Sequence, residues 1–397
     1  MEAKILTAPS GARIAYVDNI RWTVIAMVVL MHTCVTYSGM GSWFYVERTT
    51  QDVASTLVFG IYQSFAQAFF MGLLFFLAGT LVPAAYDRKG FLRFTADRAV
   101  RLGVPSLVFM LVLDPLTNII RKVGTGEGVT WSVFLPQYRD FVLSGRFLGS
   151  SGPMWFAVAL LVFSIVYAVV RLAAGLVRGG SSRPSAAPRT FSARAINIGV
   201  ACVIAIIALV AFLLRLVQPL GTSVMNMQLG YFSSYIVLFA AGLWAGRTGF
   251  LQALPGKVGR TWLWVSIGVG LPLWMILLGL GGALEGRQDL FNGGWHWQAA
   301  AIAAWEAFFC VAFSLGLLTV YRERVNMKNR FTGLASYTGF GVYAFHAPIL
   351  VGASMLLLPV ALHPLAKALV AAGLAWVAST AFAWVVRKIP GVGRMFA

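Results

Sequence analysis

The stretch that decides the fold is IRWTVIAMVVLMH, residues 20–32, inside the first long apolar segment of the chain. Arg21 and His32 stand near its two ends. Eleven residues make almost three turns of an α-helix, so both side chains project from one face, about 16 Å apart along the axis. A cation at the edge of the hydrocarbon and a titratable ring near its centre are costly to keep in lipid. The spacing therefore indicates that a long ligand, anionic at one end and reactive at the other, lies along this helix.

The composition identifies the broad class of protein. Apolar residues make up 59% and charged residues 11% of the 397, and the mean hydropathy is +0.79, whereas soluble domains carry about 25% charged residues. We therefore predict an all-α integral membrane protein of about ten transmembrane helices, with no separate soluble domain, so that residues 1–397 form a single transmembrane domain. The predicted spans are 22–38, 56–82, 103–120, 152–171, 195–217, 229–246, 261–284, 298–320, 335–357 and 367–386.

The positions of Lys and Arg predict the orientation. With the N-terminus in the cytoplasm, most of the 31 basic residues fall in segments on the inner side, as the positive-inside rule requires. We therefore expect both termini in the cytoplasm and a multi-pass protein of the cell inner (cytoplasmic) membrane. The net charge of +18 is then a topology signal, which argues against nucleic acid as a partner.

Two connections between the predicted spans are unusual. Residues 178–190 are rich in Gly, Ser, Pro and Arg, a composition typical of loops, so we expect a mobile cytoplasmic loop over about 175–194. The longest extracytoplasmic segment covers about 121–151 and contains WSVFLPQYRDFVL, residues 131–143. This piece is amphipathic, and we expect it to lie on the outer membrane interface.

Four titratable side chains fall at nearly the same depth in four predicted spans: His32, Asp114, Glu306 and His346. Each is costly in a membrane unless it is satisfied, so such residues are functional candidates by default. A chemical role is favoured for His32, because Arg21 lies on the same helix face. Glu306 is expected either to contact the reactive histidine or to lock two helices together.

The other residues in the spans have structural alternatives. For His346 a structural role is as well supported as a functional one, and Asp114, which precedes Pro115, is interpreted first as marking a kink. Arg215 is expected to extend toward the outer face. The three cysteines all lie in predicted spans and no pair has metal-ligand spacing, so the sequence predicts neither a disulfide framework nor a metal site.

A second candidate site lies in the cytoplasmic segment FLRFTADRAVRLGVP, residues 91–105. Arg98 and Arg101 are three residues apart on one helix face, and guanidinium groups at this spacing can bind phosphates through paired, charge-assisted hydrogen bonds. An ordinary basic membrane edge that contacts lipid head groups is the alternative. Arg21 at the same depth favours a site in which three arginines bind one polyphosphate.

Four stretches of the sequence resemble the membrane acyltransferase family 3. The opening YVDNIRWTVIAMVVLMH contains the family's Arg and His pair, and RAVR, which follows FMGLLFFLAGTLVP, matches its Arg-x-x-Arg motif. GPMWFAVALLVFSIVY and ASYTGFGVYAFHAPIL resemble its Pro-Met-Trp-Phe span and its penultimate helix. Ten spans with both ends inside are the architecture of that family. Within it, the chain is most similar to the glucan biosynthesis protein C branch, which is associated with succinylation of periplasmic glucans.

The resemblance implies transfer of an acyl group, acetyl or succinyl, from cytoplasmic acyl-CoA to a hydroxyl of an extracytoplasmic glycan. In this interpretation Arg21, Arg98 and Arg101 bind the phosphates of the acyl-CoA co-substrate. His32 acts at the thioester, either as a general base or as a nucleophile, and Glu306 orients its ring or stabilises its cation. The acceptor would enter from the outer side, under residues 121–155. The candidate substrate-binding residues are His346, Trp155 and Asp114.

Two other functions stay open on the sequence. A proton-coupled carrier for a small anion or sugar would use a mid-membrane His and Glu as a proton relay, although the sequence shows no two equivalent halves. A structural subunit of an envelope polysaccharide complex is the third alternative. The residues do not determine the acyl group, the acceptor, the choice between direct transfer and an acyl-histidine intermediate, or the oligomeric state.

Overall fold

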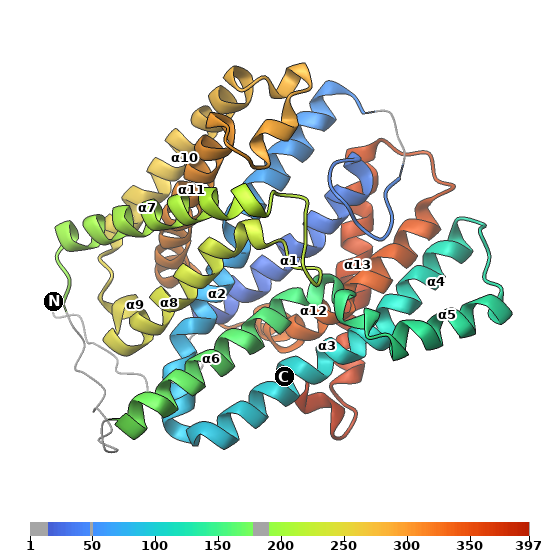
Figure 1. Ribbon diagram of the computed structural model, residues 1–397, viewed down its shortest axis with the longest axis horizontal. Coiled ribbons are helices and arrows are strands. Elements are labelled where there is room, and N and C mark those ends of the chain that lie inside the picture. The colour runs from blue at the N-terminus through green and yellow to red at the C-terminus, as the bar shows by residue number, and fades with distance from the viewer. Residues whose placement is uncertain (1–14, 48–50, 178–189, 397) are drawn as a thin grey trace.

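The structure is a computed structural model that describes residues 15–47, 51–177 and 190–396. In these residues almost all regular structure is helical, and the helices form a bundle (Figure 1). Two π-helical turns, Ala99–Gly103 and Phe109–Leu113, join α2, α3 and α4 into one continuous helical run. The helices are α1 Ala15–Ser38, α2 Val53–Arg98, α3 Val104–Val108, α4 Asp114–Gly124, α5 Trp131–Leu143, α6 Trp155–Val177, α7 Ala193–Val217, α8 Phe232–Thr248, α9 Phe250–Ala253, α10 Gly256–Leu280, α11 Trp297–Arg324, α12 Arg330–Leu357 and α13 Pro364–Val386.

Nine helical segments in the described ranges are long and apolar enough to cross a membrane, which is the character of a multi-pass membrane protein. The sequence predicted about ten. The difference arises because the predicted spans 56–82 and 103–120 belong to one helical run, Val53–Gly124. Gly90, with φ of +70°, kinks this run, and glycine adopts that conformation at little cost. The cytoplasmic segment that the sequence predicted between these two spans is therefore a kinked part of the helical run.

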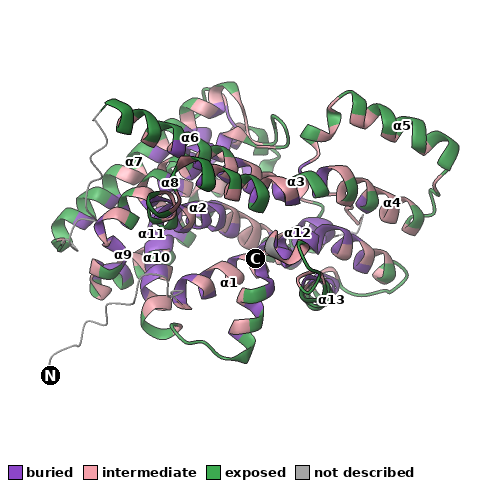
Figure 2. Ribbon diagram, turned by 90° about the horizontal axis from the view of Figure 1, so that it is seen from below, coloured by how far each residue is buried: buried purple, intermediate pink, exposed green. Residues whose placement is uncertain are grey.

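The helices differ in how deeply they are buried. α2, α11 and α12 lie mostly inside the bundle, whereas α6, α7, α10 and α13 expose most of their length (Figure 2). The exposed positions are apolar, for example Val166, Leu209 and Val377. Helices that are apolar on the outside as well as the inside are typical of membrane spans. The candidate active site accordingly lies among the inner helices.

Small residues bring α2 and α8 into close contact. A Cβ at Gly79 would lie 2.4 Å from the backbone oxygen of Phe239, and one at Gly242 would lie 2.2 Å from the backbone oxygen of Phe76. Glycine at helix interfaces lets two backbones approach closely in a membrane. Any side chain at these positions must therefore push the two helices apart.

We expect Gly242→Ala to lower the stability of the purified protein by about 1–3 kcal/mol, because the added methyl group meets a backbone carbonyl that cannot move by itself. Gly199→Ala on α7 is the matched control, since a Cβ at Gly199 has no atom within 4 Å. Thermal unfolding followed by tryptophan fluorescence measures both variants. Equal unfolding midpoints would contradict the close packing of α2 against α8.

One end of the bundle gathers basic residues from several helices. Asp87 of α2 lies 3.1 Å from Arg171 and 3.3 Å from Arg247. Asn19 of α1 donates from Nδ2 to the carbonyl of Val325, which follows α11, at 2.6 Å. We call this end the basic end. Arg171 and Arg247, which the sequence assigned to one side of the membrane, therefore lie at one carboxylate.

α4 and α5 lie at one edge of the bundle (Figures 1 and 2). The amphipathic piece predicted over 131–143 is the helix α5, and none of its residues is buried. Tyr138 donates from its hydroxyl to the carbonyl of Leu111 at 2.8 Å and holds α5 to the bundle. Its location on a membrane interface stays a prediction. Of the mobile loop predicted over about 175–194, residues 178–189 lie outside the described part of the chain.

Candidate active site

A cavity of about 740 Å³ lies in the half of the bundle away from the basic end. Its wall comes from α1, α2, α6, α8 and α12, from the start of α4, and from the loops that follow α1 and precede α6, α8 and α11. The volume is that of a typical small-molecule site. The predicted residues His32, Asp114 and Trp155 all line it. Three of the candidates are therefore brought together, although they are distant in sequence.

The His32 ring is hydrogen-bonded to the second mid-membrane histidine. His32 Nδ1 lies 3.0 Å from His346 Nε2, and His346 Nδ1 lies 2.8 Å from the backbone oxygen of Tyr343. A carbonyl can only accept, so His346 Nδ1 carries a hydrogen and Nε2 of the neutral ring is an acceptor. His32 Nδ1 must then be the donor to His346. The two rings thus form a chain that runs from the cavity wall to a backbone carbonyl.

This chain determines which nitrogen of His32 is reactive. Because Nδ1 donates to the buried His346, neutral His32 has its lone pair on Nε2. In the described part of the structure Nε2 has no hydrogen-bond partner, and the ring lines the cavity. The imidazole therefore faces the cavity and not lipid, with the nitrogen that can accept a proton available to a ligand.

A loop residue holds the His32 ring from the other side. Trp43 stacks on it with ring centroids 3.7 Å apart and planes 14° from parallel. Its loop is fixed by Glu47, whose backbone N–H donates to the carbonyl of Thr36 at 2.8 Å and whose carboxylate lies 2.6 Å from Lys367 Nζ. Both side chains of this ion pair are largely shielded from solvent. The loop therefore restricts rotation of the imidazole.

Trp155 reaches the cavity from the start of α6. The turn before it is tied to α12, because the hydroxyl of Tyr343 donates to the carbonyl of Pro153. The Trp155 ring packs on Tyr235 of α8 with centroids 5.4 Å apart. The motif that the sequence analysis identified around Trp155 thus forms part of the cavity wall.

The three predicted phosphate-binding arginines meet at the basic end. Arg98 is close enough to Arg101 and Arg21 for their charges to interact. Arg21 pairs with Asp18 at 3.5 Å, and Arg101 pairs with Asp97 at 3.1 Å. Three guanidinium groups and two carboxylates leave a positive surplus, which an anion at this end would neutralise.

The cavity does not extend to these arginines. On α1 its described wall begins at Val28 and includes His32, and seven residues along a helix place Val28 about 10 Å from Arg21. The space that a long ligand would need between Arg21 and His32 along α1 is therefore not part of this cavity. The two parts of the predicted site lie on the same helix but remain separate in this conformation.

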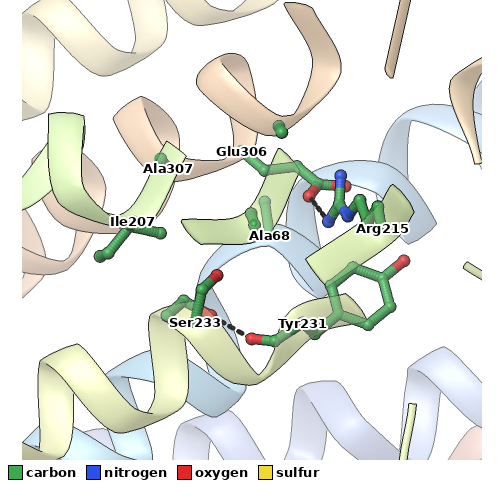
Figure 3. Close-up of a pocket in the computed structure, with 10 residues that line it drawn as sticks. Ala68, Ile207, Arg215, Tyr231, Ser233, Glu306 and Ala307 are labelled. Atoms are coloured by element: carbon green, nitrogen blue, oxygen red, sulfur yellow. Dashed lines mark hydrogen bonds and ion pairs between the residues drawn. The ribbon is translucent and has the colours of Figure 1, made fainter. Parts of the chain in front are cut away.

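Glu306 of α11 pairs with Arg215 of α7, and no hydrogen bond or ion pair joins it to His32 within the described residues (Figure 3). This corrects the expected contact with the reactive histidine, and it supports the alternative that Glu306 locks two helices together. The expected extension of Arg215 to the outer face was also wrong. Arg215 is 1% exposed, and its Nε donates to the carbonyl of Gly230 at 3.1 Å. A carbonyl and a carboxylate oxygen replace water at Nε and at one terminal nitrogen of the guanidinium, which makes its burial tolerable.

The Arg215–Glu306 pair lines a void of about 10 Å³ that is distinct from the large cavity. Tyr231 lines both, and the guanidinium lies 5.3 Å from its ring centroid. The ion pair therefore supports the cavity wall from behind.

Sequence reasoning missed Trp43 and the partner of His32. Trp43 follows the first span in a non-helical stretch, where periodicity carries no information. His346 was identified as a candidate, but its contact with His32 joins residues 314 positions apart, which no local pattern reveals. The interpretation of Asp114 as a kink marker was incomplete, because Asp114 follows a π-helical turn and also lines the cavity. Such turns are common at functional sites.

The bundle and its cavity define a class of protein: a multi-pass membrane protein in which a cavity-lining histidine is hydrogen-bonded to a buried one. Histidine pairs of this kind suit proton transfer. Residues 14–388 match the family model Acyl_transf_3, described as an acyltransferase domain, so the chain belongs to this acyltransferase family. The match covers nearly the whole chain and supports membrane acyltransferase activity. No curated protein and no solved structure matches the chain. The glucan biosynthesis protein C branch stays a prediction.

Proposed function

We propose that the protein is a membrane O-acyltransferase that moves an acyl group, acetyl or succinyl, from cytoplasmic acyl-CoA to a hydroxyl of an extracytoplasmic glycan. The observation that carries the proposal is the available Nε2 of His32 on the cavity wall, held by His346 in the tautomer that accepts a proton. In the proposed orientation the basic end and both termini face the cytoplasm. The cavity then opens on the outer side of the inner membrane.

The proposed reaction centres on His32 Nε2. As the acceptor oxygen attacks the thioester carbonyl carbon, the hydroxyl proton passes to Nε2. The carbon–sulfur bond breaks, and Nε2 returns the proton to the leaving thiolate, so the products are an ester and the CoA thiol. In the second route Nε2 itself attacks the thioester carbonyl carbon, and the carbon–sulfur bond breaks to release the CoA thiolate. The acceptor oxygen then attacks the acyl-imidazole, the bond from carbon to Nε2 breaks, and the hydroxyl proton ends on the CoA thiolate, so the products are again an ester and the CoA thiol. Both routes need Nε2 without a proton, which is the state that the hydrogen bond to His346 favours.

The proposed donor suits the separation of the two parts of the site. Acyl-CoA carries phosphates at one end and a thioester at the other, joined by a long arm. Arg21 and His32 lie about 16 Å apart along α1, and the arginine cluster supplies the positive surplus that phosphates require. Because the cavity stops short of the basic end, donor binding must widen the space between the helices.

The proposed acceptor suits the rest of the cavity wall. Aromatic rings can pack against the C–H faces of sugar rings, and side-chain amides both donate and accept hydrogen bonds with hydroxyl groups. The aromatic wall residues are Trp43, Phe44, Phe70, Trp155, Tyr231, Tyr235 and Tyr343, and the amide residues are Gln63, Gln67, Asn226, Gln228 and Asn292.

The carrier alternative finds less support in the geometry. A relay for transported protons must pass them onward, but the chain from His32 ends on the backbone oxygen of Tyr343, which cannot hand a proton on. Glu306, the expected second member of the relay, is paired with Arg215. Both observations favour an imidazole that exchanges a proton with a bound substrate over one that relays protons across the membrane.

Incubation of the purified protein in lipid nanodiscs with radiolabelled acetyl-CoA or succinyl-CoA and envelope glycans tests the proposed function. We expect release of CoA thiol and transfer of the label to the glycan. A carrier or a structural subunit would release no thiol above the rate of spontaneous hydrolysis, and that result would contradict the proposal.

Replacement of both Arg98 and Arg101 by Gln is expected to weaken acyl-CoA binding by roughly 10- to 100-fold, because charge-assisted hydrogen bonds to phosphate are lost. Isothermal titration with acetyl-CoA measures the effect, and acetyl-pantetheine, which lacks the nucleotide phosphates, should bind equally to both proteins. Arg139→Gln on α5, at an exposed position, is the matched control. Unchanged acetyl-CoA affinity in the double variant would show that the pair only contacts lipid head groups.

A further inference from the structure

The cavity wall carries a negative charge without a basic residue to balance it. Among the described residues that line the cavity, Asp114 is the one acidic or basic residue apart from His32. No Lys or Arg is among them, and the other polar wall groups are amides, hydroxyls and the indoles of Trp43 and Trp155. A ligand in this cavity therefore meets one negative charge and no compensating cation.

The Asp114 carboxylate is available to a ligand. Within the described part of the chain it forms no hydrogen bond or ion pair, since Asn118 donates to the Asp114 backbone carbonyl and not to the carboxylate. Asp114 follows the π-helical turn Phe109–Leu113 and is half-buried. A carboxylate at such a depth needs hydrogen-bond donors. The hydroxyl groups of a sugar can supply them, whereas a second carboxylate cannot.

The Arg and the Lys that are buried in the described part of the chain are already neutralised. Arg215 is paired with Glu306 behind Tyr231, outside the cavity wall. Lys367 is paired with Glu47 in the loop region and is likewise buried. Neither can offset a further negative charge in the cavity without breaking an existing ion pair, which is strongly unfavourable for buried charges.

We propose that Asp114 sets the charge selectivity of the cavity: it favours transfer of a neutral acyl group, such as acetyl, to a neutral hydroxylated acceptor, and it disfavours an acyl group with a free carboxylate, such as succinyl. This inference rests on the proposed function and narrows its donor. The bonds made and broken are those of the transfer described above, and Asp114 takes no part in them. Its charge acts on the substituent of the acyl group, for example the free carboxylate of succinyl. It also accepts hydrogen bonds from acceptor hydroxyls next to the one that attacks the thioester.

The size of the effect follows from Coulomb's law. Two carboxylates about 7 Å apart at an effective dielectric constant of about 20 repel strongly enough to change relative rates roughly 50-fold. We therefore expect kcat/KM with acetyl-CoA to exceed that with succinyl-CoA by a factor of this order. In Asp114→Asn, which keeps the shape and one oxygen but removes the charge, the ratio should fall at least about tenfold.

The test uses the full-length protein in nanodiscs at pH 8, with maltopentaose as a neutral glucose oligomer and mass spectrometry of the acylated product. Asp140→Asn is the matched control, because Asp140 lies on the exposed helix α5 and pairs with Arg146 there. This control should leave the ratio between the two donors unchanged.

The outcomes separate the two proposals. Efficient use of succinyl-CoA by the unmodified protein, or an unchanged donor ratio in Asp114→Asn, overturns the role of Asp114 and leaves the acyltransferase proposal standing. Thiol release from neither donor, with any glycan, overturns the proposed function and this inference with it. A reduced donor ratio in Asp114→Asn but not in Asp140→Asn supports both.

Discussion

Acyl transfer is expected to fall by a factor on the order of 1000 or more when His32 is replaced by Gln, while acyl-CoA still binds at the basic end. The substitution removes the only nitrogen in the proposed reaction that accepts the acceptor's proton, and general acid–base catalysis contributes about 10²- to 10⁴-fold. Glutamine is polar and of similar length, so the Trp43 contact is disturbed less than by alanine. Thiol release gives the rate, and titration with acetyl-CoA gives the affinity.

The same substitution at His363 is the control. His363 precedes α13, is exposed and contacts Asp52 outside the cavity, so His363→Gln should retain the full rate. Full activity of His32→Gln would end the proposed mechanism. Mass spectrometry of protein quenched during turnover separates the two routes, because an acyl-histidine intermediate adds the mass of the acyl group to the peptide that contains His32.

The fold was predictable to the extent that hydropathy alone determines it. Membrane spans are recognisable as long apolar segments, because every backbone polar group in lipid must be hydrogen-bonded within its own helix. Each predicted span lies in a helical segment of the structure. The count differed at one point, where Gly90 kinks a continuous helical run. A glycine inside a polar stretch is compatible with both a kink and a loop, so the sequence could not distinguish them.

The sequence identified several residues of the candidate site, but it did not show which of them interact with one another. A titratable residue in a span is conspicuous because it is costly there, which is why His32, His346 and Glu306 could be named. Which of these residues pairs with which, by a hydrogen bond or an ion pair, depends on the tertiary structure. Glu306 lies at nearly the depth of His32, but Arg215 is the cation that comes within reach of it. Depth along the membrane normal therefore limits possible partners without selecting one.

The Trp43 contact illustrates a second limit. Aromatic residues are frequent in this chain, which has 29 Phe and 13 Trp, and a tryptophan just outside a span is ordinary at a membrane interface. Its functional placement depends on the loop, which the buried Glu47–Lys367 pair folds back over α1. That pair joins residues 320 positions apart, so nothing near Trp43 in the sequence indicates it.

Replacement of His346 by Leu is expected to reduce kcat by roughly 100-fold with little change in KM. Leucine removes the acceptor for His32 Nδ1, so the donor is left unsatisfied in the interior. The ring is then free to place its hydrogen on Nε2, and in that tautomer it cannot accept the proton of the substrate hydroxyl. His346 is thus a positioning residue, since it acts on the substrate only through His32.

A conservative variant separates this role from a merely structural one. His346→Gln can place its side-chain oxygen near the position of Nε2 and accept the same hydrogen, so we expect it to recover the rate to within about tenfold of the unmodified protein. Loss of packing alone would lower thermal stability in step with activity and would leave the two variants similar. Equal rates for His346→Leu and the unmodified protein would show that the stacked Trp43 fixes the ring without help. The hydrogen bond between the two histidines would then be a consequence of packing, and the direction of the His32 lone pair would have to be set by the ligand.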